Sequence, residues 1–440
     1  MRKSPKIMVI GIDGAPYSFL KLHKDSGELP FIRSMIDDGS FIQTDSVIPT
    51  ISSVAWASYM TGLNPGGHGI YGFVDRTSNP FEMYIPTGNN LKAKTIWQIL
   101  SSLGKRVIVV NVPVTYPPKS VNGIMVAGFL ATNVRKATYP PEVANYLEEI
   151  DYRVDVDSEL AHRDLGEFLV ELDYVLQKRL EAALHFIKNY QWDFFQLHIM
   201  ETDRINHFLF RKYADKDPIY YERFMGFYRK LDAFLGEIRS SLPEGCEFIV
   251  LSDHGFCPIL KEVNINRFLM ENNYLKFTGS NKPKWQNISR ETKAYSLIPG
   301  RIYINLKGRE AMGSVKPGRD YDRLRDELVE ALTNITDPQT GAKISQRVFK
   351  REDLYSGKET QKAADIIIQP SNGYEIKASL EGTFMADPGK IKGMHTFHDA
   401  ALIMSGKILK PGEHSIIDLF PTIMKMMGIR FNDCEGNSLI

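Results

Sequence analysis

The sequence is poor in cysteine and shows no cysteine pattern. Its 440 residues include three cysteines, Cys246, Cys257 and Cys434, without the paired spacing of a thiol metal site. Three isolated cysteines cannot all pair and do not form a disulfide framework. This pattern is typical of proteins that work in a reducing compartment. We therefore expect a cytoplasmic protein, long enough to bury a large core and to contain more than one domain.

Long hydrophobic runs and blocks of like charge are also absent. The apolar run that begins at Ile7 is only four residues long, too short for a signal peptide or a membrane span. The formal net charge is +1, from 54 basic and 53 acidic residues. This balance predicts no nucleic-acid-binding surface and no anionic membrane as the main partner.

Two glycine-containing segments lack the features of nucleotide-binding loops. Residues 11–14 do not have the spacing of a dinucleotide loop, and residues 64–69 lack the Lys-Ser/Thr pair that ends a P-loop. No internal repeat, low-complexity tract or clean linker divides the chain. Binding of a nucleotide cofactor through either motif is therefore not expected.

What the sequence does contain is an alternation of short apolar runs with helical patterns. The predicted strands, each with an apolar centre, lie at 7–12, 106–112, 124–127, 194–200, 247–251, 365–369 and 400–404. The helical patterns lie at 29–36, 51–61, 92–103, 165–190, 223–242 and 415–427. This alternation predicts an α/β fold whose mostly parallel sheet is covered on both faces. We expect a core made of residues 1–257 and 351–440, with an irregular insert near 129–165, and a separate inserted region at 258–350.

One predicted helix begins with a cluster of hydroxyl side chains. Thr50, Ser52 and Ser53 follow Pro49, and Gly62 marks the end of the same helix. Backbone N–H groups point outward at a helix start and its dipole is positive there, so the place suits an oxyanion or a phosphate. The alternative is that Thr50 or Ser52 serves only as an N-cap.

Three carboxylates follow predicted strands, where ligands bind in doubly wound sheets. They are Asp13, Asp203 and Asp253. Asp203 and His207 are four residues apart, so a helix would place both on one face. Asp253 is followed directly by His254. Taken singly, the first pair could be a surface ion pair and the second part of a turn.

Histidines near the end of the chain complete the set. His395 precedes the predicted strand at 400–404, and His398 lies three residues further on. Asp and His side chains without paired thiols suit Zn²⁺, and Mn²⁺ less well. Two such ions about 4 Å apart can clamp the attacking and leaving oxygens of an in-line displacement. A hydroxyl beside them can become a nucleophile near neutral pH.

The order of these residues resembles the alkaline phosphatase superfamily, and more closely its type I phosphodiesterase/nucleotide pyrophosphatase branch. The similarity runs from Val9 to Ile423, and the segments 54–56 and 60–70 are especially typical. The resemblance implies a three-layer α/β/α sandwich like that of alkaline phosphatase. We also expect the irregular segment at 129–165 and the inserted cap region at 258–350 to roof the site and to select the substrate.

The resemblance further implies two divalent ions, Zn²⁺ first and Mn²⁺ as the alternative. One ion would be held by Asp203, His207 and His395, with His398 as a possible replacement for His395. The other would be held by Asp13, Asp253, His254 and the oxygen of the nucleophile. Counting nine residues back from Thr61, as in the family, gives Ser52 as the nucleophile. Thr50 is the second candidate, and the backbone N–H of Ser53 would hold a phosphoryl oxygen.

The function implied is that of a two-metal phosphodiesterase with a covalent phospho-serine intermediate. A small phosphate ester or nucleotide-like molecule would be its substrate. Phe73 stands where nucleotide pyrophosphatases carry a phosphate-binding Asn, so the substrate clamp differs. A phosphomonoesterase, a phosphonate hydrolase or a phosphoryl transferase of the same superfamily is the alternative. A metal-binding scaffold without catalysis is the alternative from another class.

Overall fold

The computed structural model describes residues 5–77, 81–279 and 282–440. The chain divides into two compact units. The first unit consists of residues 1–64, 87–257 and 395–440, and the second consists of residues 65–86 and 258–394. In the part of the chain that the structure describes, no helix is both long and apolar enough to cross a bilayer.

The first unit is built on an eight-stranded sheet with the order β2-β19-β9-β1-β8-β5-β6-β7. The five strands from β9 to β6 run parallel, whereas β19 and β7 run antiparallel to their neighbours. The strands are β1 (Ile7–Ile12), β2 (Gly39–Thr44), β5 (Val107–Val110), β6 (Gly123–Val126), β7 (Thr138–Tyr139), β8 (Phe194–Ile199), β9 (Glu247–Leu251) and β19 (Ala400–Ser405). Every residue of β1 and β8 is buried, as expected for central strands covered on both faces.

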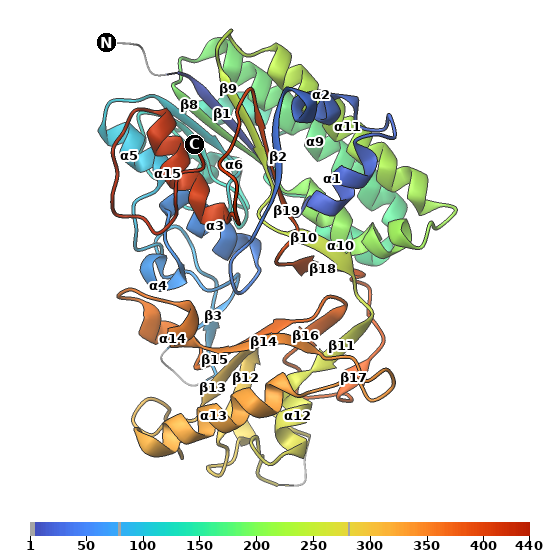
Figure 1. Cartoon of the computed structure of the whole chain (residues 1–440), viewed down its shortest axis with the longest axis vertical. Coiled ribbons are helices and arrows are strands. Elements are labelled where there is room, and N and C mark those ends of the chain that lie inside the picture. The colour runs from blue at the N-terminus through green and yellow to red at the C-terminus, as the bar shows by residue number, and fades with distance from the viewer. Residues whose placement is uncertain (1–4, 78–80, 280–281) are drawn as a thin grey trace. The chain divides into compact units, whose positions relative to one another are not determined.

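Helices cover both faces of this sheet (Figure 1). On one face lie α1 (Tyr17–His23), α2 (Pro30–Asp38), α9 (Leu165–Asn189), α10 (Glu201–Ala214) and α11 (Tyr220–Ser240). On the other lie α3 (Ser52–Thr61), α5 (Ile96–Ser102) and α15 (Leu419–Met426), which the short helix η3 (Ile416–Asp418) precedes. The predicted α/β fold with a large, mostly parallel sheet is confirmed.

The irregular segment near 129–165 contains short elements only. They are α6 (Val134–Ala137), α7 (Val143–Glu149) and α8 (Ser158–Arg163), besides the edge strand β7. The helix expected at 51–61 forms and ends at Gly62, whose left-handed φ of 71° glycine adopts without strain. All ten residues of α3 are buried, so it is an internal helix.

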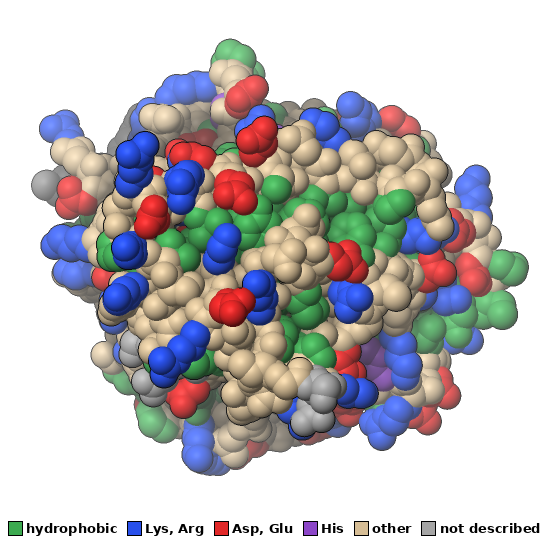
Figure 2. Space-filling view, turned by 90° about the horizontal axis from the view of Figure 1, so that it is seen from below, with side chains coloured by type: hydrophobic (Ala, Val, Ile, Leu, Met, Phe, Trp, Pro, Cys, Tyr) green, Lys and Arg blue, Asp and Glu red, His purple; other side chains and the backbone are tan. Residues whose placement is uncertain are grey.

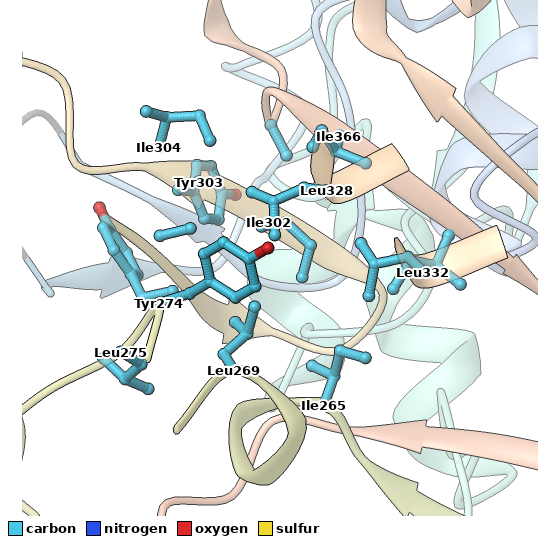
Figure 3. Close-up of a cluster of buried hydrophobic side chains, with 14 of the residues drawn as sticks. Ile265, Leu269, Tyr274, Leu275, Ile302, Tyr303, Ile304, Leu328, Leu332 and Ile366 are labelled. Carbon is cyan, nitrogen blue, oxygen red and sulfur yellow. The ribbon is translucent and has the colours of Figure 1, made fainter. Parts of the chain in front are cut away.

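The second unit has its own antiparallel sheet and its own core. Its four-stranded sheet has the order β12-β13-β15-β14, and a three-stranded sheet has the order β16-β11-β17. Figure 3 shows side chains of the core, among them Leu269, Ile302 and Leu328, pointing toward one another. Strands and helices of this unit are β3 (Asp75–Arg76), β4 (Met83–Tyr84), β11 (Lys261–Asn264), β12 (Ala294–Ile298), β13 (Arg301–Ile304), β14 (Ser345–Lys350), β15 (Ile366–Pro370), β16 (Tyr374–Lys377), β17 (Met385–Ala386), α4 (Pro65–His68), α12 (Ile265–Glu271), η1 (Trp285–Asn287), α13 (Arg319–Thr333), α14 (Arg351–Leu354) and η2 (Thr360–Lys362).

The second unit is larger than the insertion expected at 258–350. It continues to Met394 and includes residues 65–86, and its boundaries fall within β10 (Gly255–Pro258) and β18 (Gly393–Thr396). The apolar run at 365–369, expected in the core sheet, forms β15, which pairs antiparallel with β13 and β14. These ladders are the physical reason that residues 351–394 belong to the second unit.

Candidate metal centre

The sequence-predicted acidic residues lie at one edge of the parallel sheet. Strand β1 pairs in parallel register with β8 and β9, with Ile12 opposite Ile199 and Gly11 opposite Leu251. The carboxyl ends of the three strands are therefore level. Asp13, Asp253 and the start of α10, which carries Asp203, follow these ends. The arrangement is the one expected for a ligand site in an open α/β sheet.

Asp13, Asp253 and His254 form the first of two groups whose ligand atoms lie within 4.8 Å of one another. All three side chains are fully buried. His254 Nε2 lies 3.5 Å from Asp13 Oδ1 and 3.4 Å from Asp253 Oδ2. The Nδ1 atom of His254 is 3.1 Å from the carbonyl oxygen of Gly255 and must donate to it, which leaves the Nε2 lone pair facing the carboxylates.

The chemistry of this first group is suited to a divalent cation, as one of its carboxylate oxygens shows. Asp253 Oδ2 is a buried oxygen with no hydrogen-bond partner in the described part of the chain. Burial, followed by the neighbouring charge of Asp13, raises the pKa of Asp253 well above its usual range. Burial lowers the pKa of His254 to about 3, so this imidazole is neutral, the form that binds metal. A cation would compensate the two buried carboxylates.

Asp203, His207 and His395 form the second group. His395 Nε2 lies 3.2 Å from Asp203 Oδ1 and 3.1 Å from His207 Nε2. His207 Nε2 lies 3.3 Å from the same carboxylate oxygen, because α10 places residues four apart on one face. His395 Nδ1 donates to the carbonyl oxygen of Thr50 at 3.0 Å, which turns Nε2 toward the group.

Mutual charge interactions are strong in the second group. Burial by itself would raise the pKa of Asp203, but His207 and His395 hold that pKa well below its usual range. Burial likewise would lower the pKa of His395, and the hydrogen bond and charge of Asp203 raise it overall. The two groups adjoin each other, since the rings of His254 and His395 stack with centroids 3.7 Å apart.

Ser52 stands at the start of α3 beside the first group. Its hydroxyl donates to Asp13 Oδ1 at 3.0 Å and lies 3.2 Å from His254 Nε2. The N-cap residue of α3 is Ile51, and no side chain caps the helix, so the alternative that Thr50 or Ser52 serves only as an N-cap does not hold. The Thr50 hydroxyl instead donates to the carbonyl oxygen of Val47 at 3.1 Å.

Ser53 occupies the second position of α3, where a helix has no intrahelical acceptor for the backbone N–H. Among the described residues no acceptor for this N–H is seen, and the side-chain oxygen of Ser53 is buried without a partner. The helix start therefore offers a backbone donor beside the Ser52 hydroxyl.

Two further histidines lie outside these groups. His398 is half-exposed and its Nδ1 lies 2.8 Å from Asp45 Oδ1, so of the two late histidines it is His395 that joins a group. His68, in the glycine turn of the second unit, accepts a hydrogen bond from the Ile70 N–H at 3.1 Å. This bond agrees with a role in fixing the turn.

Two side chains that support Asp13 were not anticipated from the sequence. Its Oδ2 atom lies 2.9 Å from His198 Nε2 and accepts a hydrogen bond from Trp56 Nε1 at 2.9 Å. His198 lies in β8 and pairs with Gly11 in the neighbouring strand. A histidine within a buried strand whose other residues, except Gln196, are apolar was the signal that could have indicated it.

Comparison with known proteins identifies a family and structures of similar fold. The profile of the family described as type I phosphodiesterase/nucleotide pyrophosphatase matches residues 7–398. Phosphonoacetate hydrolase from Sinorhizobium meliloti 1021, in complex with phosphonoformate, has a similar structure, with a TM-score of 0.67, 18% identity and 96% of each chain covered. Murine ectonucleotide pyrophosphatase/phosphodiesterase 5, in an inactive form with AMP, gives a TM-score of 0.60 and 15% identity, over 98% of this chain and 97% of that one.

Proposed function

The chain belongs to the type I phosphodiesterase/nucleotide pyrophosphatase family and is therefore a phosphoester hydrolase, and from this we propose its mechanism. We propose that it is a two-metal phosphodiesterase in which Ser52 is the nucleophile. The observation that carries this proposal is the meeting of two Asp/His groups with one hydroxyl at a helix start. Asp203, His207 and His395 would hold one ion, and Asp13, Asp253, His254 and Ser52 Oγ the other. Oxygen and imidazole donors without thiolate favour Zn²⁺, with Mn²⁺ as the alternative.

The chain's own residues support a displacement at phosphorus. The Ser52 oxygen would form a P–O bond while the bond to the leaving oxygen breaks, giving a phospho-serine that water then hydrolyses. The Ser52 oxygen lies 3.0 Å from Asp13 Oδ1 and 3.2 Å from His254 Nε2, two acceptors for its hydroxyl proton. The backbone N–H of Ser53 would donate to a phosphoryl oxygen. When bound, the ions supply positive charge that favours the ionised hydroxyl and stabilises the leaving oxygen.

The substrate class follows from the family and from what similar proteins bind. The murine phosphodiesterase was seen with AMP, and the bacterial hydrolase with phosphonoformate. We propose a small phosphodiester or nucleotide-like molecule, with hydrolysis of a monoester or of a phosphonate as the second candidate. Three substrates separate these activities. A diesterase releases nitrophenol from bis-p-nitrophenyl phosphate, and a monoesterase releases it from p-nitrophenyl phosphate. A phosphonate hydrolase releases acetate from phosphonoacetate. Turnover of the monoester alone would contradict the diesterase assignment.

The role of Ser52 is tested by a pair of matched variants. Ser52→Ala should reduce turnover of the diester by at least about 10³-fold, since the nucleophile is absent, and should leave the six Asp and His side chains in place. Thr50→Ala should retain most activity, because its hydroxyl is bonded to the Val47 carbonyl oxygen. Activity retained in Ser52→Ala and lost in Thr50→Ala would reverse the assignment.

We also propose that the protein works in the cytoplasm. Its three cysteines are free thiols, one of them buried, which suits a reducing compartment. Imaging of a fluorescent fusion in the source cell tests this location, and export of the fusion would contradict it.

A further inference from the structure

The second unit contains a cavity of about 410 Å³, whose lining residues all belong to this unit. Its lining includes Phe81, Trp285, Asn305, Glu310 and Met312. Cavities of this size with apolar walls and a few polar groups are typical of small-ligand sites. We propose that this cavity binds a neutral, hydroxyl-rich ring, that is, a sugar.

One wall of the cavity is aromatic and rests on the hydrophobic core of the second unit. The rings of Phe81 and Trp285 are stacked, with centroids 5.1 Å apart and an interplanar angle of 12°. Tyr295 packs edge-on against both rings. The wall stands on the buried cluster shown in Figure 3, against which Phe81, Trp285 and Met312 pack. An aromatic face of this kind is a platform for the apolar side of a ligand ring.

Phe81 is held in an unusual backbone conformation. Its φ of 65° is left-handed, a region that a bulky aromatic residue rarely adopts. Such strain persists where the surroundings fix it, and it concentrates at functional sites. Here the contacts with Trp285 and Tyr295 fix the ring at the cavity.

The polar groups of the cavity are anchored and present oxygen acceptors. Both hydrogens of the Asn305 amide are used, since Nδ2 donates to the carbonyl oxygens of Thr292 and Met312 at 2.8 and 2.9 Å. Its Oδ1 takes part in neither bond. Arg76 and Arg309 contact Glu310 at 2.8 and 2.9 Å, and both end on Oε1. Oε2 lies outside both ion pairs, and the Tyr295 hydroxyl also hydrogen-bonds to this carboxylate.

The charges of the cavity select against other classes of ligand. Glu82 and Glu310 both line it, and no Lys or Arg is found among its lining residues in the described part of the chain, so a phosphate or another anion would lack a cationic partner there. A cationic amine finds Glu310 already paired with two arginines. A wholly apolar ligand would leave the buried Asn305 and Glu310 desolvated. Hydroxyl donors on a ring with an apolar face satisfy both the acceptors and the aromatic wall.

Intrinsic fluorescence provides a test that does not depend on phosphoesterase activity. Trp56, Trp97 and Trp192 are at most 2% exposed, whereas Trp285 is half-buried at the cavity. Titration of the intact protein with methyl glucoside, methyl galactoside or N-acetylglucosamine should give a saturable change for at least one of them. Tetramethylammonium, a cation without hydroxyl groups, should give none. No response to any sugar, or saturation by tetramethylammonium instead, would overturn the proposal.

A matched pair of variants ties the signal to the cavity. Ala311→Phe fills the space beside Met312 and should abolish the response, whereas Ala342→Phe, at an exposed position of the same unit outside the lining, should leave it unchanged. Equal responses in both variants would contradict the location. By calorimetry, Trp285→Ala should weaken sugar binding about tenfold and Trp285→Phe much less. Equal sugar affinity in the wild type, Trp285→Ala and Trp285→Phe would also contradict the role of Trp285 as an aromatic platform.

Discussion

Gly11 occupies a position in β1 where no side chain fits. An alanine Cβ at this residue would lie 2.3 Å from Cη2 of Trp56 and 2.8 Å from Cζ2 of the same ring. The strand cannot yield easily, since Gly11 pairs with His198 on one side and Leu251 on the other. Trp56 is fully buried. Gly11→Ala must therefore displace the indole that holds Asp13.

The magnitude follows from two contributions. Overpacking a well-packed core by one methyl group costs about 1–3 kcal/mol. Loss of the hydrogen bond from Trp56 Nε1 to the Asp13 carboxylate, 2.9 Å long here, adds about 1.5–3 kcal/mol. Together they predict a loss of roughly 2.5–6 kcal/mol, a large fraction of the stability of an ordinary domain. For a unit of the size of the first one, the corresponding drop in Tm is roughly 4–10 °C.

Gly226→Ala is the matched control for this substitution. Gly226 lies inside α11, and its Cβ would approach only the end of the Arg229 side chain, at 3.8 Å. There alanine should be neutral or stabilise the protein by about 0.5–1 kcal/mol. Urea unfolding and metal analysis of both variants check the argument. If Gly11→Ala unfolds at the wild-type urea concentration and binds metal normally, the rigidity of the Trp56–Asp13 contact has been overestimated.

Three further predictions concern metal, pH and a buried ion pair. Chelation of the metal with EDTA should lower the Tm of the protein, and added Zn²⁺ should restore it. The variant Asp253→Ala should bind about half as much metal as the wild type, as measured by atomic emission. Full metal content in that variant would remove Asp253 from the ligand set. Burial lowers the pKa of His68 in the folded protein to about 3, whereas in the unfolded chain it is about 6.5. As the pH falls, the unfolded chain therefore binds a proton at this residue before the folded protein does. The stability of the folded protein should decline below about pH 6.5 for this reason. His68→Asn should flatten that decline in urea midpoints measured between about pH 6.5 and 4; an unchanged slope would refute the assignment. Asp365→Asn, which weakens the ion pair with Arg309, should cost about 3–5 kcal/mol in urea unfolding, and a loss below about 1 kcal/mol would contradict its importance.

Most of the first unit could be predicted from local pattern. The apolar runs at 7–12 and 194–200 become β1 and β8, because runs buried on both faces are typical of central parallel strands. Residues 165–190 form α9 within one residue of the expected range. The periodicity of such a long helix leaves little ambiguity.

The boundary of the second unit could not be predicted in the same way. The centre of the segment at 365–369, Ile366 to Ile368, is as apolar as a central strand, but the segment pairs with β13 and β14. Hydrophobicity indicates that a strand is buried, and contains no information on which sheet it joins. Nor could the position of residues 65–86 in the second unit be predicted, since long-range packing alone decides it.

The two candidate ligand groups were accessible from the sequence because each Asp follows a strand or shares a helix turn with a His. His198 was not, because a histidine inside a buried strand is equally compatible with a structural role. Its relation to Asp13 depends on the parallel register between β1 and β8, which sequence pattern leaves undetermined. Trp56 was noted only as part of a familiar segment, and its contact with Asp13 needs α3 to be placed against β1.

The geometry of Asp13 links the nucleophile to the sheet. Its Oδ2 accepts from Trp56 and faces His198, while its Oδ1 accepts from Ser52. Ser52 and Trp56 are four residues apart in α3, so one face of a single helix supplies both contacts. Any shift of α3 would move the hydroxyl and the support of the carboxylate together. This coupling explains why α3 is buried on all sides, since a site of this kind requires its helix to be fixed by packing.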